Sequence, residues 1–451
     1  MRPTMIILVG ITLIFLSLLG CATVNTDEEW SRFRKTSLER TGHEPLWEQS
    51  EGEETSIRKE IREILADGLS RDEAVKVALF NNRLLQSTFE EIGISKSDLV
   101  QAGLFRNPSI AALFRFPLNG GSTNIDAIGI FSLSDFWQIP FRKKVAAAQL
   151  EMSMMRVNQI LLDTAAEAKR AYDALYYLRL GQEQTEDILG KFQEINEQVK
   201  TRRQFGFSSD LDIYFSQVMV VEAQMELYRI QRESAMAKAH LDQVLGFSRG
   251  LTDYQMRKSQ QIQLHGIPKV EVAWQQALSH RFDIQMARFK IAEAERKLAL
   301  EKVYVFREVN FLLSYERGVD KEEVFGPGID LQLPIFDQNQ AQIARTQYMV
   351  RRARKRLQAL EEQIKEEVIR DLERIDLHKT KAYMLEDQVI PLRQRALDYT
   401  SKWVNAMQLN RLFLLEAQKG LMRTQLDLLQ TQMELQRALV DLERHLGGKL
   451  P

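Results

Sequence analysis

The chain has 451 residues, a single cysteine and few residues that break helices. One cysteine, Cys21, excludes a disulfide within the chain and a metal site built from several thiolates. Ten prolines and 22 glycines are few for this length, which predicts long helices. After residue 20 no apolar run approaches the ~20 residues of a membrane-spanning helix, so a polytopic helical membrane protein is excluded.

The charge balance and the motifs point away from nucleic acids and from enzymes. Lys+Arg is 61 and Asp+Glu is 62, for a net charge of -1. Nucleic-acid binding therefore lacks its electrostatic footprint. The six histidines form no His-x-x-x-His pair, and there is no phosphate-binding glycine loop. We expect no catalytic residues, no metal site and no cofactor.

The N-terminus reads as a targeting segment. Arg2 is followed by fifteen mostly apolar residues, 5–19, which fit a signal-peptide core and are short for a spanning helix. The run Leu-Leu-Gly-Cys ending at Cys21 resembles a bacterial lipobox, which implies that Cys21 becomes the lipidated first residue. We assign 1–20 to a lipoprotein signal peptide and 21–70 to a lipidated N-terminal segment. The alternative is a signal anchor with an incidental cysteine.

The remaining sequence is written twice. Ala78-Leu79 recurs as Ala277-Leu278, and Leu245-Gly246 recurs as Leu446-Gly447, at offsets of 199 and 201 residues. Matches that keep their order and spacing indicate a duplication. We predict a first repeat over 71–246, a linker over 247–269 and a second repeat over 270–447.

Each repeat contains two short segments of alternating polarity. In the second repeat, apolar residues occupy every other position over 309–315 and 329–333; in the first, the alternation covers 112–116 and an apolar segment covers 128–133. Period two predicts strands. Four strands cannot close a barrel, and an open edge cannot face lipid. Strands pooled from three chains would give 12, and from two chains 8, both permitted numbers for a membrane barrel.

Long helices follow the strands. Proline is absent from 141 to 267, and a helix over 145–204 would be ~90 Å long. Pro391 and Gly190 occupy equivalent places in the repeats, which predicts a shared kink. The C-terminal helix carries two heptad series on nearly opposite faces, as in a helix with neighbours on both sides; an ordinary bundle helix remains the alternative. These series are Leu426, Met433 and Val440, and Leu428, Leu435 and Leu442.

Taken together, the mature sequence resembles the TolC-like outer-membrane efflux family. The resemblance rests on the lipobox, the two Ala-x-x-x-Ala-Leu openings, and the paired Leu-Gly ends. It also includes Ile-Ser-Lys-Ser-Asp-Leu-Val-Gln-Ala-Gly-Leu at 94–104 and Leu-Gln-Leu-Pro-Ile-Phe-Asp at 331–337. It implies a mainly α fold of long coiled-coil-like hairpins in two repeats. Each repeat would add a two-stranded β insertion to an intermolecular transmembrane β-barrel.

The resemblance also implies a function and partners. The protein would be a homotrimer, lipid-anchored in the bacterial outer membrane, with a helical extension into the periplasm. It would be the exit duct of a tripartite efflux system, moving small molecules or metal ions. Its partners would be a periplasmic adaptor, an inner-membrane pump and outer-membrane lipid.

Family members carry a recognisable pattern where each long helix turns back at the periplasmic tip. A glycine is followed by serine at +3, an acidic residue at +6 and glutamine at +11, matched here by Gly206, Ser209, Asp212 and Gln217. Glycine suits the turn and Ser209 is a plausible helix cap. These residues are predicted to form the first adaptor-docking tip.

The second tip departs from this pattern. Met407 stands at the glycine position, Asn410 at the serine position and Phe413 at the acidic position. Asn410 can still cap the returning helix. Glu416 is our candidate for a gate of three charges; the alternative is a surface ion pair with Lys419.

Two other classes of protein remain as alternatives. A structural coiled-coil lipoprotein spanning the periplasm would not need the alternating segments. A periplasmic adaptor usually has one helical hairpin inside β-rich domains, whereas this chain has two hairpins and few strands.

Overall fold

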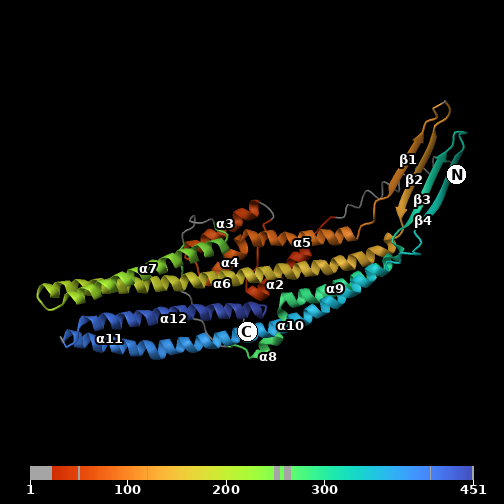
Figure 1. Ribbon diagram of the computed structural model, residues 1–451. Helices are drawn as coiled ribbons and strands as arrows, with labels where there is room; N and C mark the ends of the chain where they lie inside the picture. The colour runs from red at the N-terminus through yellow and green to blue at the C-terminus, as the bar shows by residue number, and fades with distance from the viewer. Residues whose placement is uncertain are drawn as a thin grey trace. The chain divides into compact units, whose positions relative to one another are not determined.

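A computed structural model describes residues 23–48, 51–118, 120–247, 254–257, 266–406 and 408–448 (Figure 1). The described residues form two compact units. The sheet unit takes its residues from 1–33, 89–157 and 283–359, and the hairpin unit takes the rest. Cys21 and Met407 lie outside the described residues.

The elements alternate between helices and two pairs of strands. In chain order they are α2 (Asp27–Thr41), α3 (Glu51–Ala66), α4 (Arg71–Asn81), α5 (Arg83–Ala102), β1 (Ser109–Arg115), β2 (Asn124–Ser132), α6 (Asp135–Gln204), α7 (Asp210–Val244), α8 (Val270–His280), α9 (Phe282–Val303), the 3₁₀ helix η1 (Tyr304–Phe306), β3 (Val309–Arg317), β4 (Glu323–Leu331), α10 (Gln340–Tyr383), the π-helical segment η2 (Met384–Val389), α11 (Ile390–Asn405) and α12 (Arg411–His445). This order confirms a mainly helical fold with two strand pairs.

The sheet is antiparallel, with the strand order β1-β2-β3-β4. Its two central strands come from different repeats, and Phe131 of β2 pairs with Phe311 of β3. The outer edges of β1 and β4 have no pairing partner among the described residues. All of β1 is exposed and no residue of the other three strands is fully buried. The sheet therefore lacks cover on both faces and both edges within one chain.

Helices of the sheet unit are held together by polar contacts as well as by packing. Lys96 of α5 contacts Glu29 of α2 at 2.6 Å, and Arg32 contacts Glu151 of α6 at 2.8 Å. On α9, Arg296 donates to the carbonyl oxygen of Lys144 at 2.9 Å. These contacts tie α2, α5, α6 and α9 into one unit.

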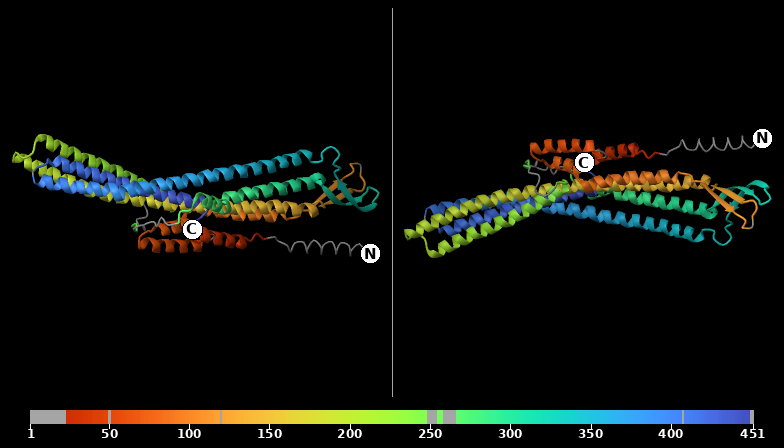
Figure 2. Two further views of the ribbon diagram at one scale, coloured as in Figure 1. Left: turned by 90° about the horizontal axis from the view of Figure 1, so that it is seen from below. Right: turned by 90° about the horizontal axis from the view of Figure 1, so that it is seen from above.

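In the hairpin unit, α6 turns back into α7 and α11 turns back into α12 (Figures 1 and 2). Buried apolar residues from α6, α7 and α12 form one core because long helices present a stripe every three to four residues. This core contains Ile188, Leu189, Phe192, Ile195, Val199, Ala223, Leu227, Leu415 and Met422. Nearer the end of α12, Val440 and Leu442 are both buried, as expected for a helix with neighbours on opposite faces.

The two repeats end in the same way. Gly246 and Gly447 both have positive φ, +75° and +80°, a conformation that favours glycine. Each packs directly on the end of the repeat's opening helix: an added Cβ would lie 2.2 Å from the carbonyl oxygen of Asn81 or 2.8 Å from that of His280. The paired Leu-Gly ends are thus equivalent in the fold and mark the duplication.

The predicted shared kink is wrong at one of its two positions. Helix α6 continues through Gly190, whereas η2 interrupts the helix just before Pro391. Proline has no N–H and clashes with the preceding turn, so the helix must rearrange. Glycine keeps its N–H, and it costs stability without breaking the hydrogen-bond ladder.

Candidate functional site

The first tip is a glycine turn at the end of α6. Gly206 has φ +77°, and its N–H donates to the carbonyl oxygen of Arg203 at 3.0 Å. The N–H of Phe207 donates to the carbonyl oxygen of Arg202 at 2.9 Å. These bonds close a left-handed helix cap of the kind that glycine permits. The structure thus places Gly206 at the turn to which the sequence assigned it.

Ser209 and Asp212 begin α7 as a reciprocal capping box. The N–H of Asp212 donates to Ser209 Oγ at 3.2 Å, and the N–H of Ser209 donates to Asp212 Oδ2 at 2.8 Å. Such a box satisfies two helix-end donors at once. Burial opposes ionisation of Asp212, but the hydrogen bonds from Ser209 and Asn410 outweigh it and lower the pKa of the carboxyl.

Asn410 caps the second tip. Its Oδ1 accepts from the N–H of Leu412 at 3.0 Å at the start of α12. Before it, the N–H of Gln408 donates to the carbonyl oxygen of Trp403 at 2.9 Å. The predicted cap is therefore present, although the turn is built without a described glycine.

A hydrogen bond joins the two tips. Asn410 Nδ2 donates to Asp212 Oδ1 at 2.8 Å, so the two predicted cap residues bind each other as well as their own helices. The sequence marked both residues as caps but held no sign of this bond, because 198 residues separate them.

Two further contacts join α12 to the first hairpin. Arg411 donates to Gln198 of α6, and Lys419 forms an ion pair with Glu222 of α7. Burial lowers the pKa of Arg411, and nearby Arg202 lowers it further. We call the three contacts Asn410–Asp212, Arg411–Gln198 and Lys419–Glu222 the tip latch.

Glu416 lies on the exposed face of α12. Within the described part of the chain, Lys419 pairs with Glu222 and not with Glu416. The surface pair considered from the sequence is therefore not formed, and the carboxylate points to solvent in one chain. Phe413, at the place of the family's acidic residue, is also exposed.

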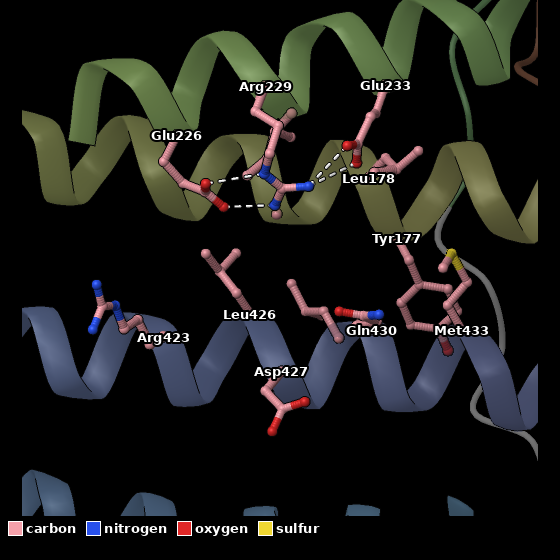
Figure 3. A pocket seen from close by; sticks show the side chains of 13 residues that line it. Tyr177, Leu178, Glu226, Arg229, Glu233, Arg423, Leu426, Asp427, Gln430 and Met433 are labelled. Atoms are coloured by element: carbon pink, nitrogen blue, oxygen red, sulfur yellow. Dashed lines mark hydrogen bonds and ion pairs between the residues drawn. The ribbon is translucent and has the colours of Figure 1, made fainter. Parts of the chain in front are cut away.

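A groove of about 490 Å³ runs between α7 and α12 over α6 (Figure 3). Arg229 lies at its edge, 2.6 Å from Glu226 and 2.9 Å from Glu233. Hydrogen bonds from Glu226 raise the pKa of Arg229 most strongly. Both carboxylates already engage this guanidinium, so it is not free to bind an anion. Among the described residues no cluster of three or more His, Cys, Asp or Glu is placed to hold a metal ion.

Helices α7 and α11 each carry an exposed apolar seam. Spacing alternates between three and four residues, as in a coiled-coil seam. On α7 the seam consists of Leu211, Tyr214, Val218, Val221, Met225 and Tyr228. On α11 it consists of Leu392, Ala396, Tyr399 and Trp403. Apolar surfaces of this size on a soluble helix mark contact with a partner.

The strand pairs, the double hairpins and the paired caps agree with one family of proteins. Residues 273–448 match the family described as "Outer membrane efflux protein". This match places the chain in the outer membrane efflux protein family. A comparison with curated proteins finds no match.

Solved structures of outer-membrane channels share the fold. The channel OprN aligns with a TM-score of 0.71 at 17% identity, covering 84% of this chain and 90% of its own. VceC of Vibrio cholerae gives 0.69 at 16% identity over 84% and 97%. The open state of MtrE of Neisseria gonorrhoeae gives 0.70 at 16% identity over 84% and 89%. At these identities the likeness establishes the fold.

The fold decides between the alternatives drawn from the sequence. The strands are present in both repeats, so a purely coiled-coil lipoprotein is not favoured. Two hairpins and one four-stranded sheet do not match the β-rich arrangement expected of an adaptor. Within the described ranges, no helix combines the length and the apolar character needed to cross a membrane.

Proposed function

We propose that the protein is the outer-membrane exit duct of a tripartite efflux system. It passes small molecules or metal ions from a periplasmic adaptor and an inner-membrane pump to the outside, without enzymatic activity. The observation that carries this proposal is the four-stranded sheet with two open edges in a fold shared with outer-membrane channels.

The sheet supports assembly into a barrel. Unpaired N–H and C=O groups along β1 and β4 cannot face lipid, because nothing there can bond them. Pairing β1 of one copy with β4 of the next satisfies both edges. Three copies then give a closed barrel of 12 strands, an even number typical of outer-membrane barrels.

The exposed seams support a ring of hairpins below that barrel. The α7 seam of one copy packs on the α11 seam of the next, so two different surfaces meet at each contact. Contacts of this heterologous kind generate closed rings when the rotation closes. The two seams supply the apolar surface that such a contact must bury.

The tips support docking and gating. Phe205, Phe207 and Leu409 are exposed at the two turns, where an adaptor would find apolar contacts. The tip latch holds the start of α12 on the first hairpin, so opening of the duct requires the latch to break. Glu416 remains our candidate for a charged ring in the closed state.

The N-terminus supports a lipid anchor. Cys21 follows a signal-peptide core and ends a lipobox-like run, and several acyl chains on it would give stable attachment. Mass spectrometry of the mature protein should find a lipidated Cys21 at the N-terminus. A mature chain that begins elsewhere would contradict the anchor.

Channel formation is the direct test of the function. The purified full chain, reconstituted in planar bilayers, should open discrete ion-conducting channels. A protein that stays monomeric in detergent and yields no conductance in the bilayer would refute the proposal.

Disulfide cross-linking tests the ring independently. Val218 lies eight residues after the start of α7 and Ala396 nine residues before the end of α11. The bond between the two tips sets these positions level. A V218C/A396C double variant should form covalent oligomers under oxidation. The control V218C/D398C, about 200° around α11 from the seam, should not. Equal cross-linking of the two variants would rule out the seam pairing.

A further inference from the structure

The connections between the strands and the helices carry an excess of positive charge. Segments 104–108, 133–144, 302–308 and 332–339 contain six basic and three acidic residues, although the whole chain has a net charge of -1. The basic residues are Arg106, Arg142, Lys143, Lys144, Lys302 and Arg307, and the acidic residues are Asp135, Glu308 and Asp337. The foot of the sheet is therefore electropositive.

One acid of this set is buried between two arginines. Asp135 is 0% exposed; Arg106 Nε donates to its Oδ1 at 3.1 Å, and Arg142 Nη2 donates to the same oxygen at 3.1 Å. One carboxylate cannot neutralise two guanidiniums, so one positive charge is left over. The exposed Lys143 and Lys144 follow directly and add to it.

The second repeat adds its charge to the same place. Gln138 Nε2 of α6 donates to the carbonyl oxygen of Arg307 at 2.9 Å, which anchors the segment before β3 on the start of α6. Burial raises the pKa of Tyr304, and Arg142, Arg106 and Arg307 all oppose this rise. Three arginines from two repeats therefore surround one phenol group.

Exposed aromatic rings lie beside these cations. Phe105 and Phe136 pack edge to face with centroids 5.2 Å apart, yet they remain 56% and 67% exposed. Trp137 follows and is also exposed. Aromatic rings next to cations are typical of the level where a membrane meets water.

We propose that this surface binds the head-group phosphates of anionic phospholipids. We call it the basic collar and define it by Phe105, Arg106, Phe136, Trp137, Arg142 and Arg307, with the adjacent Lys143 and Lys144. Guanidinium groups match phosphate geometry, and the rings lie among the first acyl carbons. The inference rests on the proposed function, since it assumes that the sheet spans a membrane.

Neutralising three exposed cations tests the collar without disturbing Asp135. The variant is K143Q/K144Q/R307Q. The control, R352Q/K355Q/R356Q, removes the same charge from exposed positions on α10. Native mass spectrometry of the detergent-solubilised full chain, titrated with phosphatidylglycerol or phosphatidylcholine, measures binding. The wild type should prefer phosphatidylglycerol. The collar variant should bind it on the order of a hundred-fold more weakly, or roughly five-fold per cation, and the control should match the wild type.

Three results would overturn the collar. One is equal affinity of the wild type for the two lipids. Another is equal loss of phosphatidylglycerol binding in the collar variant and the control, or no loss in either. The third is displacement of the lipid by inorganic phosphate alone, which would indicate a site for free phosphate.

Planar-bilayer conductance separates this inference from the proposed function. If the collar variant conducts like the wild type and keeps its lipid, the collar is refuted and the duct stands. If the wild type forms no channels, the duct itself fails. A collar variant that dissociates into monomers in native mass spectrometry would assign these residues to contacts between copies and overturn lipid binding.

Discussion

Replacing Asn410 with serine removes one contact of the tip latch and keeps the cap of α12. Asn410 uses its Oδ1 to cap Leu412 at 3.0 Å and its Nδ2 to bind Asp212 at 2.8 Å. Serine caps helices about as well as asparagine, but its shorter side chain has no amide that reaches the other hairpin. Any effect of N410S therefore reports on the bond between the tips and not on loss of the cap.

The structure sets the expected size of the effect. Asp212 is 8% exposed, and hydrogen bonds to charged groups contribute about 1.5–3 kcal/mol. We expect the lower end, ~1.5 kcal/mol, because the carboxylate keeps its two bonds from Ser209 at 2.8 and 2.9 Å. This free energy corresponds to roughly a ten-fold shift of the closed–open equilibrium toward the open channel.

Single-channel recording in planar bilayers measures that shift as open probability. The matched control is D210N, on the same tip, where an exposed Asp210 pairs with Arg203. Exposed pairs of this kind contribute little, so D210N should open like the wild type. If N410S opens no more often than the wild type, or if D210N opens equally often, the latch does not hold the duct closed.

Three further predictions concern pH, backbone conformation and the gate. Because the pKa of Asp212 is lowered in the folded chain, the latch should be fully stabilising above the ordinary carboxyl pKa of about 3.9 and be lost as pH falls through the lowered value; open probability should then rise with acid in the wild type but not in D212N. G246A should lower the thermal midpoint, by at least ~2 kcal/mol of stability, because φ is +75° and the new Cβ would lie 2.2 Å from a backbone oxygen of α4. G190A, with nothing within 4 Å, should stabilise α6 by about 0.5–1 kcal/mol, and a lower midpoint for it would contradict this account. E416A should change cation selectivity or open probability whereas E434A, farther along α12, should not; identical behaviour of the two variants would return Glu416 to the ordinary surface.

Local rules explain what the sequence determined by itself. The alternation over 309–315 predicted β3 because a strand shows opposite faces at every step, and the structure has that strand at Val309–Arg317. Lack of proline predicted a helix at 145–204, and α6 contains it entirely. Ser209 and Asn410 were identified as caps because a cap depends only on residues two or three positions away.

Contacts between distant segments were decided only by the tertiary structure. The bond from Asn410 to Asp212 needs two helix starts at one level, which no spacing along one helix encodes. Lys419 had an acidic neighbour three residues away, yet it pairs with Glu222 of another helix, because packing of α12 against α7 brings that carboxylate closer. The basic collar likewise joins connections of both repeats, which lie together only because β2 pairs with β3. Periodicity is a property of one segment, whereas a latch or a collar is a property of how segments pack.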